Sequence, residues 1–334
     1  MIKVAILGAA GFVGAELLRL CEHHPAFVPA RLFGESTAGA RLADVHPQLA
    51  LAYPSLTIEN YAGDLTGADL VFAALPHGAS QKIASTILDR GVPFVDLGAD
   101  FRLRDPAEYH RWYGEPHDAP ALLDRFVYGI PELNREAIRD AQAVAAAGCY
   151  PTAAILALKP LVDAGLVDPA SLVVDAASGV SGAGKALKDA THFNTVDESF
   201  AAYGLIAHRH TAEMEASLGA SILFTPHLAP MNRGILATCY GTATGAGDPL
   251  DVLKAAYADE PFVHVSDRSP ATKWTLGSNA VHVTARRDER TGHILAIAAL
   301  DNLVKGAAGQ MIQCANLMLG LDETAGLPRV GVYP

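Results

Sequence analysis

The residues best suited to carry chemistry surround Cys149, near the middle of the chain. Residues 146–152 read AAGCYPT, between a small-residue run (141–147) and an alanine- and leucine-rich run (153–159). This pattern predicts a buried strand, a tight turn and a helix, because a helix tolerates Pro in its first turn, where an N–H has no partner. Helix N-terminal N–H groups and the helix dipole lower a thiol's pKa and bind an oxyanion. Cys149 is therefore the candidate nucleophile; the alternative is a small buried cysteine that packs the turn.

A second group of reactive side chains occurs in the run HRHTAE at residues 208–213. His208 and His210 each offer a general base, and Glu213, three residues beyond His210, offers a carboxylate to orient it. The pattern HxHxxE could also bind a metal, but the sequence shows no further cluster of ligands. We therefore predict acid–base chemistry here and no metal site.

The N-terminal elements predict a nucleotide-binding fold. An apolar strand at 2–7 leads into GAAGFVG at 8–14 and then an amphipathic helix at 15–20. In this strand–turn–helix context the glycine spacing indicates dinucleotide binding, although an ordinary strand-to-helix turn is the alternative. Gly8 and Gly11 allow a tight turn and close approach of a pyrophosphate, and Gly14 lets the helix pack on the sheet.

The nucleotide specificity stays open from the residues. A second strand, 28–33, ends near Glu35, Ser36, Thr37 and Arg41. Glu35 alone favours the free ribose hydroxyl of NAD, whereas the other three together favour the 2′-phosphate of NADP.

The next loops should line the cofactor crevice, which forms at the carboxyl ends of parallel strands. A strand at 69–75 precedes Pro76-His77, which we expect near the nicotinamide or phosphates, and a helix is predicted at 80–90. A strand at 93–97 precedes Arg102, which either pairs with Asp100 or Asp105 or receives an anion. Residues 109–124 are predicted to be irregular.

The second half of the chain has a different sequence pattern, with a second glycine-rich loop and several strand-like segments. A strand at 171–176 precedes SGVSGAGK at 178–185, which lacks a phosphate-loop frame because Ala186 follows the lysine, so we expect a loop that touches cofactor or substrate. Residues 194–208 are polar and irregular. Strand-like segments occur at 222–235, 236–242, 262–265, 280–285 and 294–300, and a helix at 311–319.

These elements predict an α/β protein with two domains. The first is a Rossmann-type doubly wound parallel sheet formed by residues 1–148 and about 311–334. The second, residues 149–310, is an α+β domain with a largely antiparallel mixed sheet, which would hold the substrate, the catalytic residues and a dimerisation surface.

The bulk composition narrows the class of protein. The chain has 334 residues, 50% of them hydrophobic, and a formal net charge of −11 without a cluster of Lys or Arg, which disfavours nucleic-acid binding. Its four cysteines are far apart and form no CxxC pair, which suits a reducing cytoplasm better than a disulfide framework or zinc site. No apolar run reaches the roughly 18 residues of a membrane helix, and the sequence begins with a strand rather than a cleavable leader.

Together these features point to one reaction. A thiolate attacks an acyl or aldehyde carbon, and a hydride passes between that carbon and a nicotinamide. A histidine exchanges the protons, and N–H groups at the cysteine turn stabilise the oxyanion.

The motifs resemble the N-acetyl-γ-glutamyl-phosphate reductase family over essentially the full length. The broader superfamily includes aspartate-semialdehyde dehydrogenase. The resemblance rests on GAAGFVGAELLRL at 8–20, ALPHG at 74–78, DLGADFRL at 96–103, GCYPTAAILALKPL at 148–161, SGVSGAGK at 178–185, HRHTAEM at 208–214, HLAPMNRGI at 227–235 and DNLVKGAAGQ at 301–310. Two positions depart from the usual pattern: Ala147 replaces a Pro and Gly98 replaces a common Ser.

The resemblance implies NADPH-dependent reduction of an acyl phosphate to a semialdehyde, a step of arginine biosynthesis, by a homo-oligomer. Cys149 would be the nucleophile, with His210 the preferred base over His208, and Glu213 would orient the base or contact substrate. Substrate contacts are expected at Arg102, Ser178 and Arg233. Contacts to NADP(H) are expected at Gly8, Ala10, Gly11, Phe12, Val13, Gly14, Ser36, Thr37, Pro76, His77, Ser181, Gly182 and Asn316.

Three rival functions remain at this point. The same chemistry on an aspartyl or aminoadipyl phosphate would use the same residues. A non-catalytic NADP-binding sensor would need neither Cys149 nor His210, and an alcohol-type dehydrogenase would need no cysteine nucleophile.

Overall fold

The computed structural model describes residues 1–333 as two compact units, which are treated separately below. The first comprises residues 1–147 and 307–327, and the second comprises residues 148–306 and 328–333. The sequence had placed the C-terminal segment from about 311 onward entirely in the first domain. The final residues instead belong to the second unit, where Pro328 O accepts from Asn279 N and Val332 N donates to Leu276 O.

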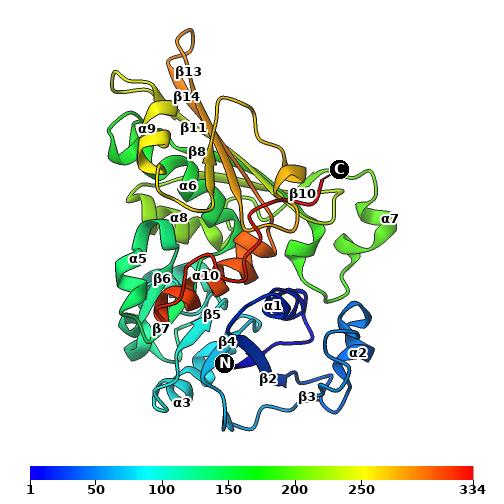
Figure 1. Cartoon of the computed structure of the whole chain (residues 1–334). Helices are drawn as coiled ribbons and strands as arrows, with labels where there is room; N and C mark the ends of the chain where they lie inside the picture. The colour runs from blue at the N-terminus through cyan, green and yellow to red at the C-terminus, as the bar shows by residue number, and fades with distance from the viewer. Residues whose placement is uncertain (334) are drawn as a thin grey trace. The chain divides into compact units, whose positions relative to one another are not determined.

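The first unit is built on a seven-stranded sheet in the order β3-β2-β1-β4-β5-β7-β6. Every neighbouring pair is parallel, and the order reverses direction at β1, as in a doubly wound fold (Figure 1). This confirms the predicted Rossmann-type domain. The strands are β1 (Ile2–Leu7), β2 (Phe27–Phe33), β3 (Ile58–Glu59), β4 (Leu70–Ala73), β5 (Phe94–Asp96), β6 (Phe126–Gly129) and β7 (Ala143–Ala146).

Several helices belong to this unit. They are α1 (Phe12–Glu22), α2 (Leu42–Val45), α3 (Ala84–Leu88), α4 (Pro106–Tyr113), α5 (Pro131–Arg139) and α10 (Gly309–Met318). Helix α10 returns from the end of the chain and packs against α1, α5, β5, β6 and β7. The helix expected at 80–90 is interrupted: a 3-10 turn at Ser80–Lys82 precedes α3.

One prediction for this unit is wrong. Residues 109–113, expected to be irregular, form the second half of α4. Asp105 caps this helix by accepting from Ala107 N at 2.8 Å, Pro106 stands in its first turn, and Gly114 ends it with a left-handed φ of 79°. The aromatic and histidine content of these residues suggested an irregular segment, although Asp105, Pro106 and Gly114 are typical of the start and end of a helix.

The second unit is built on a mixed sheet in the order β12-β13-β14-β11-β8-β10-β9. Four of the six pairs are antiparallel, and β12–β13 and β8–β10 are parallel, which confirms the predicted mixed sheet. Its strands are β8 (Val173–Gly179), β9 (Ala201–Ala202), β10 (Leu223–Ala229), β11 (Ile235–Thr242), β12 (Val263–Val265), β13 (Val281–Asp288) and β14 (His293–Leu300).

The central helix of this unit is α6 (Cys149–Asp163), which packs on β11 and β14 and against α8 (His210–Leu218) and α9 (Pro249–Ala256). Pro160 interrupts its hydrogen bonding, because proline has no N–H to donate to the carbonyl of Leu156. The Tyr257 hydroxyl donates to that carbonyl instead, at 2.7 Å. The helix that begins at Cys149 is thus kept intact across its proline.

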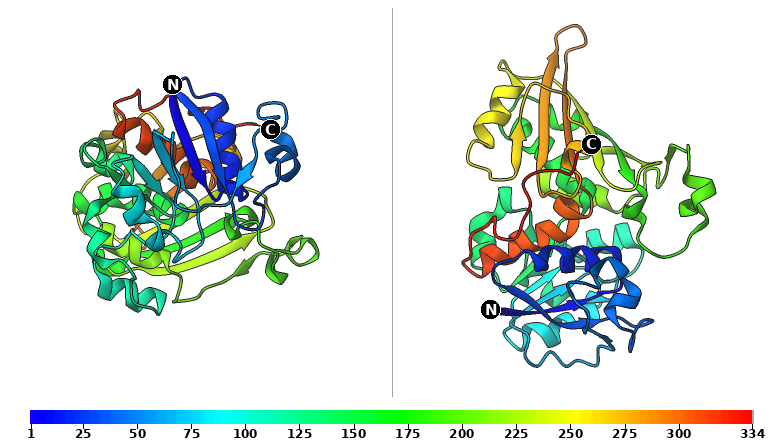
Figure 2. Two further views of the ribbon diagram at one scale, coloured as in Figure 1. Left: turned by 90° about the horizontal axis from the view of Figure 1, so that it is seen from below. Right: turned by 45° about the vertical axis from the view of Figure 1, so that its right-hand side comes forward.

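The segment between β8 and α8, drawn in green, extends away from the mixed sheet, as Figure 2 shows. It carries α7 (Phe193–Val196), the short β9 and two 3-10 turns, Val180–Ala183 and Asp189–Thr191. Large apolar side chains on it are exposed, among them Leu187, Phe193 and Ile206. Among residues 1–333, no helix is both long and apolar enough to cross a bilayer.

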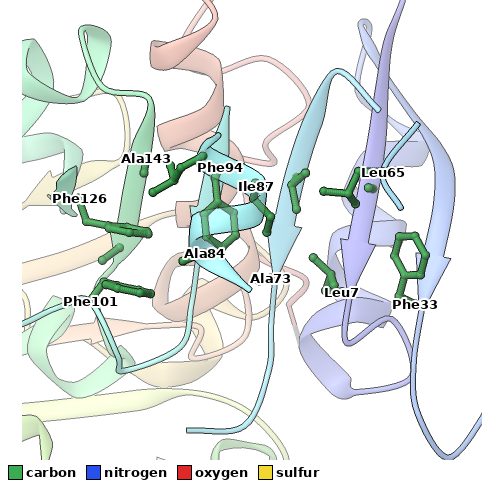
Figure 3. Packing of buried hydrophobic residues seen from close by; sticks show 14 of the residues in the cluster. Leu7, Phe33, Leu65, Ala73, Ala84, Ile87, Phe94, Phe101, Phe126 and Ala143 are labelled. Carbon is green, nitrogen blue, oxygen red and sulfur yellow. The ribbon is translucent and has the colours of Figure 1, made fainter. Parts of the chain in front are cut away.

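The core of the first unit consists of apolar side chains from successive strands and helices. Phe94 on β5 is fully buried and meets Phe126 edge-on at a centroid distance of 5.7 Å, and Phe126 stacks on Phe101 at 4.0 Å (Figure 3). Leu7, Phe33, Ala73 and Ile87 belong to the same cluster.

Phe94→Ala should therefore lower the free energy of unfolding by about 3–5 kcal/mol, because it removes buried apolar area and leaves a cavity. Leu51→Ala, at a side chain of the same unit that is 100% exposed, is the matched control and should change little. Urea denaturation of both variants checks this. An equal loss in the two would contradict the assignment of the core.

Candidate active site

The strand–turn–helix at Cys149 forms as predicted. Gly148 is the N-cap residue, with extended backbone angles, and Cys149 is the first residue of α6. All four cysteines, which lie within the described residues, are thiols rather than half-disulfides, and Cys149 alone is partly exposed. Burial raises the pKa of the Cys21 thiol to about 12 and also raises the pKa of Cys239. Cys149 is therefore the cysteine placed to react.

Glu213 joins the two groups of reactive residues. It lies in the first turn of α8, fully buried, and its Oε2 accepts from Gly148 N at 3.0 Å. Its other oxygen, Oε1, lies 3.8 Å from His210 Nε2, an ion-pair rather than a hydrogen-bond distance. One carboxylate therefore faces both the start of the cysteine helix and the candidate base.

The two histidines differ in environment. His208 Nδ1 accepts from the backbone N–H of His210 at 3.2 Å, so its own ring proton belongs on Nε2. Burial, and then the charge of Arg209, lowers the pKa of His208 to about 4. His208 is therefore neutral near pH 7. His210 retains a side-chain exposure of 21%, and its Nε2 lies 3.8 Å from Glu213 Oε1.

Two tyrosines, absent from the sequence-based site, complete this cluster. Tyr203 donates its hydroxyl to that of Tyr150 at 3.1 Å, and Tyr150 donates to His227 O at 3.0 Å. The ring of His208 meets both tyrosines edge-on, at centroid distances of 5.6 and 5.5 Å. The bond from Tyr203 thereby attaches the segment before α8 to Tyr150, the residue that follows Cys149. No pattern in the sequence indicated this pairing across 53 residues.

The predicted substrate residues Ser178 and Arg233 lie beside the glycine-rich loop. Gly179 N donates to Gly234 O at 2.9 Å and Ser181 N donates to Asn232 O at 3.2 Å. A Cβ on Gly179 would lie 2.7 Å from Arg233 N, so glycine is required for this close approach. Ser181 and the exposed Gly182 follow in the same loop.

The first unit contains the other predicted residues, and its glycine turn fits a dinucleotide. Gly8 has a φ of +85°, and a Cβ on Gly14 would lie 2.5 Å from Gly8 O. Helix α1 begins at Phe12, followed by Val13, and Gly11 is its N-cap residue. No side chain among the described residues caps this helix, and its first turn has no acidic residue. Ala10 lies within the same turn. Such a helix end suits a pyrophosphate.

The loop after β2 supplies polar groups for a ribose phosphate. The Thr37 hydroxyl oxygen is enclosed and has no hydrogen-bond partner among residues 1–333, while Ser36 is exposed. Arg41 forms an exposed ion pair with Asp44 at 2.7 Å. Exposed pairs of this kind are weak, so Arg41 is available to exchange its partner.

The turn containing Pro76 and His77 is held by Asp100. That buried carboxylate accepts from Gly78 N and Ser80 N at 2.8 and 3.1 Å and lies 3.0 Å from His77 Nδ1. Pro76 is exposed at the turn.

Arg102 is almost buried, and its Nη2 donates to Leu97 O at 2.6 Å. Of the two carboxylates considered from the sequence, that of Asp100 binds the backbone of the Gly78 turn, and that of Asp105 caps α4. Burial raises the pKa of nearby Asp96 to about 7, and Arg102 partly offsets this rise.

Asn316 is predicted to contact the cofactor. It is fully buried in α10, where its Nδ2 donates to the carbonyls of Glu323 and Ala325 and its Oδ1 lies 2.9 Å from His24 Nε2. These bonds hold its side chain within the first unit, and its contact with the cofactor remains a prediction. Among residues 1–333, no group of three or more His, Cys, Asp or Glu side chains is arranged to hold a metal ion.

Two family models match the chain. One, described as semialdehyde dehydrogenase, NAD binding domain, matches residues 3–141, and the other, semialdehyde dehydrogenase, dimerisation domain, matches residues 149–302. Fold and sequence thus define a semialdehyde dehydrogenase-class oxidoreductase.

Curated relatives identify the family within that class. N-acetyl-gamma-glutamyl-phosphate reductase from Desulforudis audaxviator is 48% identical over 350 residues, and that from Pseudomonas aeruginosa 43% over 344, each alignment covering 100% of both chains. The protein belongs to the N-acetyl-gamma-glutamyl-phosphate reductase family, which confirms the resemblance seen in its motifs.

Solved structures share the fold at low identity. Aspartate semialdehyde dehydrogenase II from Vibrio cholerae, complexed with ASA, has a TM-score of 0.72 at 19% identity, covering 96% of this chain and 98% of that one. The Candida albicans aspartate semialdehyde dehydrogenase with NADP has a TM-score of 0.71 at 16% identity and the same coverage.

The burial of His208 predicts a pH dependence of stability. In the unfolded chain its pKa is about 6.5, and in the folded protein about 4. Between these values the unfolded state binds more protons, so the free energy of unfolding falls as pH falls from 6.5 to 4. A His208→Gln variant should lose less stability over this window.

Urea denaturation at several pH values, compared between the wild type and the variant, isolates this group because the other titrating residues are common to both. Parallel curves would show that His208 is not held neutral by the fold.

Proposed function

We propose that this protein reduces N-acetyl-γ-glutamyl phosphate to N-acetylglutamate 5-semialdehyde with NADPH, releasing phosphate, as a step of arginine biosynthesis. The observation that carries the proposal is the arrangement at the start of α6. Cys149 is the first residue of this helix, and Glu213 accepts from the N-cap residue Gly148 and lies 3.8 Å from His210. Membership of the reductase family supports the same substrate.

In the proposed reaction, the Cys149 sulfur attacks the γ-acyl carbon. A carbon–sulfur bond forms, the bond to the phosphate oxygen breaks, and phosphate leaves with its electron pair, which gives a thioester. The first N–H groups of a helix have no partner within it, so those of α6 are suited to stabilise the oxyanion. Pro151 has no N–H, which limits these donors to the residues at the turn.

His210 is the proposed base. It takes the proton from the Cys149 thiol before attack. Glu213 orients it and favours its charged form once the proton has moved. His208, held neutral by burial, instead fixes the start of α8 through its bond from His210 N.

Arg233 and Ser178 are proposed to bind the substrate, with the guanidinium meeting the phosphate. Arg233 is 28% exposed and therefore reachable by an anion. Arg102 stays a proposed substrate contact, although its bond to Leu97 O already occupies one nitrogen.

NADPH, when bound, supplies the hydride that reduces the thioester to the aldehyde and releases the thiolate. The turn at Gly8, Gly11 and Gly14 would hold its pyrophosphate at the N-terminus of α1. Ser36, Thr37 and Arg41 would hold the 2′-phosphate, supported by the enclosed Thr37 hydroxyl that lacks a partner among residues 1–333. Pro76, His77, Ser181 and Gly182 complete the proposed contacts.

The first unit is accordingly the proposed cofactor domain, and the second the proposed catalytic and dimerisation domain. We expect a homo-oligomer, a dimer or tetramer, working in the cytoplasm. The exposed apolar side chains of Leu187, Phe193 and Ile206 support self-association. Light scattering should give a mass at least twice the 35.0 kDa of one chain, and a monomer at working concentration would refute this expectation.

The reaction is tested in reverse, with N-acetylglutamate 5-semialdehyde, phosphate and NADP, by following the absorbance of reduced nicotinamide. Wild-type protein should show phosphate-dependent turnover. Cys149→Ala should lower kcat by about 1,000-fold or more, because a nucleophile acts as a unit with its base. Cys21→Ala, which alters a buried cysteine of the first unit, is the matched control and should keep its activity.

Aspartate semialdehyde replaces the substrate in a parallel assay. Activity with this shorter aldehyde alone would assign the protein to the sister activity with its cysteine chemistry intact. Turnover that survives Cys149→Ala would overturn the mechanism.

A further inference from the structure

Two adjacent polar residues, Asp301 and Asn302, lie buried between β14 and a π-helical turn, Val304–Ala308. Their exposures are 0% and 2%. Buried polar side chains cost stability unless they are hydrogen-bonded, so their contacts show what they are for.

Asn302 connects the two loops that carry the proposed ligand contacts. Its Oδ1 accepts from Gly234 N at 2.8 Å, directly after Arg233. Its Nδ2 donates to Ser181 Oγ at 2.9 Å in the glycine-rich loop. One amide therefore uses both its acceptor and its donor to fix the spacing of the two loops.

Asp301 contacts the guanidinium itself. Its Oδ2 lies 3.7 Å from Arg233 Nη1 and accepts from Gly277 N at 2.7 Å. Its Oδ1 accepts from Leu303 N and Val304 N at 2.8 and 3.1 Å, which shapes the turn that follows.

That turn abuts the nucleophile. Asp301 O accepts from Gly306 N at 2.9 Å, and a Cβ on Gly306 would lie 2.7 Å from Cys149 Cβ. The bonds made by Asp301 thus set how closely the turn approaches Cys149.

We propose that Asp301 and Asn302 are a positioning pair that holds Arg233, Ser181 and the Gly306 turn in one arrangement about Cys149, and that Asp301 also moderates the anion affinity of Arg233. The proposal rests on the assignment of Arg233 to the substrate phosphate. Neither residue needs to touch the reacting atoms. Each acts through the groups it holds.

The two residues should have opposite effects on phosphate. Asn302→Ala releases the turn that carries Arg233 and should raise the KM for phosphate in the reverse reaction. It should lower kcat/KM by about 10- to 100-fold, the size expected of misplacement near 1 Å. Asp301→Asn removes the negative charge beside Arg233 and should lower the KM for phosphate by about two- to fivefold. The kcat should fall because the amide keeps only one of the two oxygens that accept from Gly277 N and from Leu303 N and Val304 N.

A double-mutant cycle tests the link between the loops. Ser181→Ala removes the bond to Asn302 together with the proposed cofactor contact of Ser181. The cofactor contact is lost equally with and without Asn302, so it cancels in the cycle. The double variant Ser181→Ala with Asn302→Ala should lose less activity, by at least about threefold, than the product of the two single losses. Val283→Ala, a buried change in β13 of the same unit, is the control for general destabilisation: it should lower Tm and leave the KM for phosphate unchanged.

A second measurement needs no turnover. Iodoacetamide should alkylate Cys149, the one partly exposed cysteine among the residues described, and phosphate bound at Arg233 should slow this reaction. The phosphate concentration that gives half protection should rise in Asn302→Ala and fall in Asp301→Asn.

The positioning role is overturned if the cycle is additive, or if both variants shift the phosphate dependence in the same direction, as a loss of folding alone would do. Arg233→Ala separates this result from failure of the proposed function. If protection by phosphate survives Arg233→Ala, the assignment of Arg233 to the substrate phosphate is wrong. The double-mutant cycle then still decides whether Asn302 couples the two loops. Its readout is the alkylation rate or the turnover of whichever aldehyde the protein uses.

Discussion

The hydrogen bond from Gly148 N to the buried carboxylate of Glu213 is the constraint on which the catalytic cluster depends. It joins the N-cap of α6 to the first turn of α8, and so links the helix that carries the nucleophile to the helix that carries the candidate base. A carboxylate at a helix N-terminus is electrostatically favourable. Its burial without a partner would be costly. The same contact therefore supports the fold and sets the site.

Elsewhere in the second unit, side chains also form hydrogen bonds with backbone groups outside the regular helix and strand pattern. Tyr257 replaces the N–H missing at Pro160, and Tyr150 donates to His227 O beside β8. Asn302 ties the loops at Ser181 and Gly234, where the backbone bonds between the loops end. These side-chain bonds position the irregular loops, and catalysis by proximity requires reacting groups that are held in place.

The sequence predicted features whose cause is local. The glycine turn at 8–14 and the cysteine turn at 146–152 follow from residue type and spacing, and both formed where expected. Asp105-Pro106 and Asp248-Pro249 were overlooked, although each starts a helix through an Asp cap followed by Pro. Bonds between distant residues, such as Tyr203 to Tyr150 and Glu213 to Gly148, depend on tertiary packing and left no local pattern. The bond between Asn316 and His24 was not predicted for the same reason, since the two residues lie 292 positions apart.

The bond from Tyr257 to Leu156 O has a further consequence for motion. Backbone amides exchange with solvent through local openings, and neighbouring elements that share bonds open together. Because the carbonyl of Leu156 depends on a side chain at the end of α9, fraying of α9 withdraws a bond from the middle of the helix that starts at Cys149. The helix that carries the nucleophile is therefore stabilised in part by a side chain 101 residues from Leu156 in sequence. A change at α9 that breaks this bond would loosen the middle of α6.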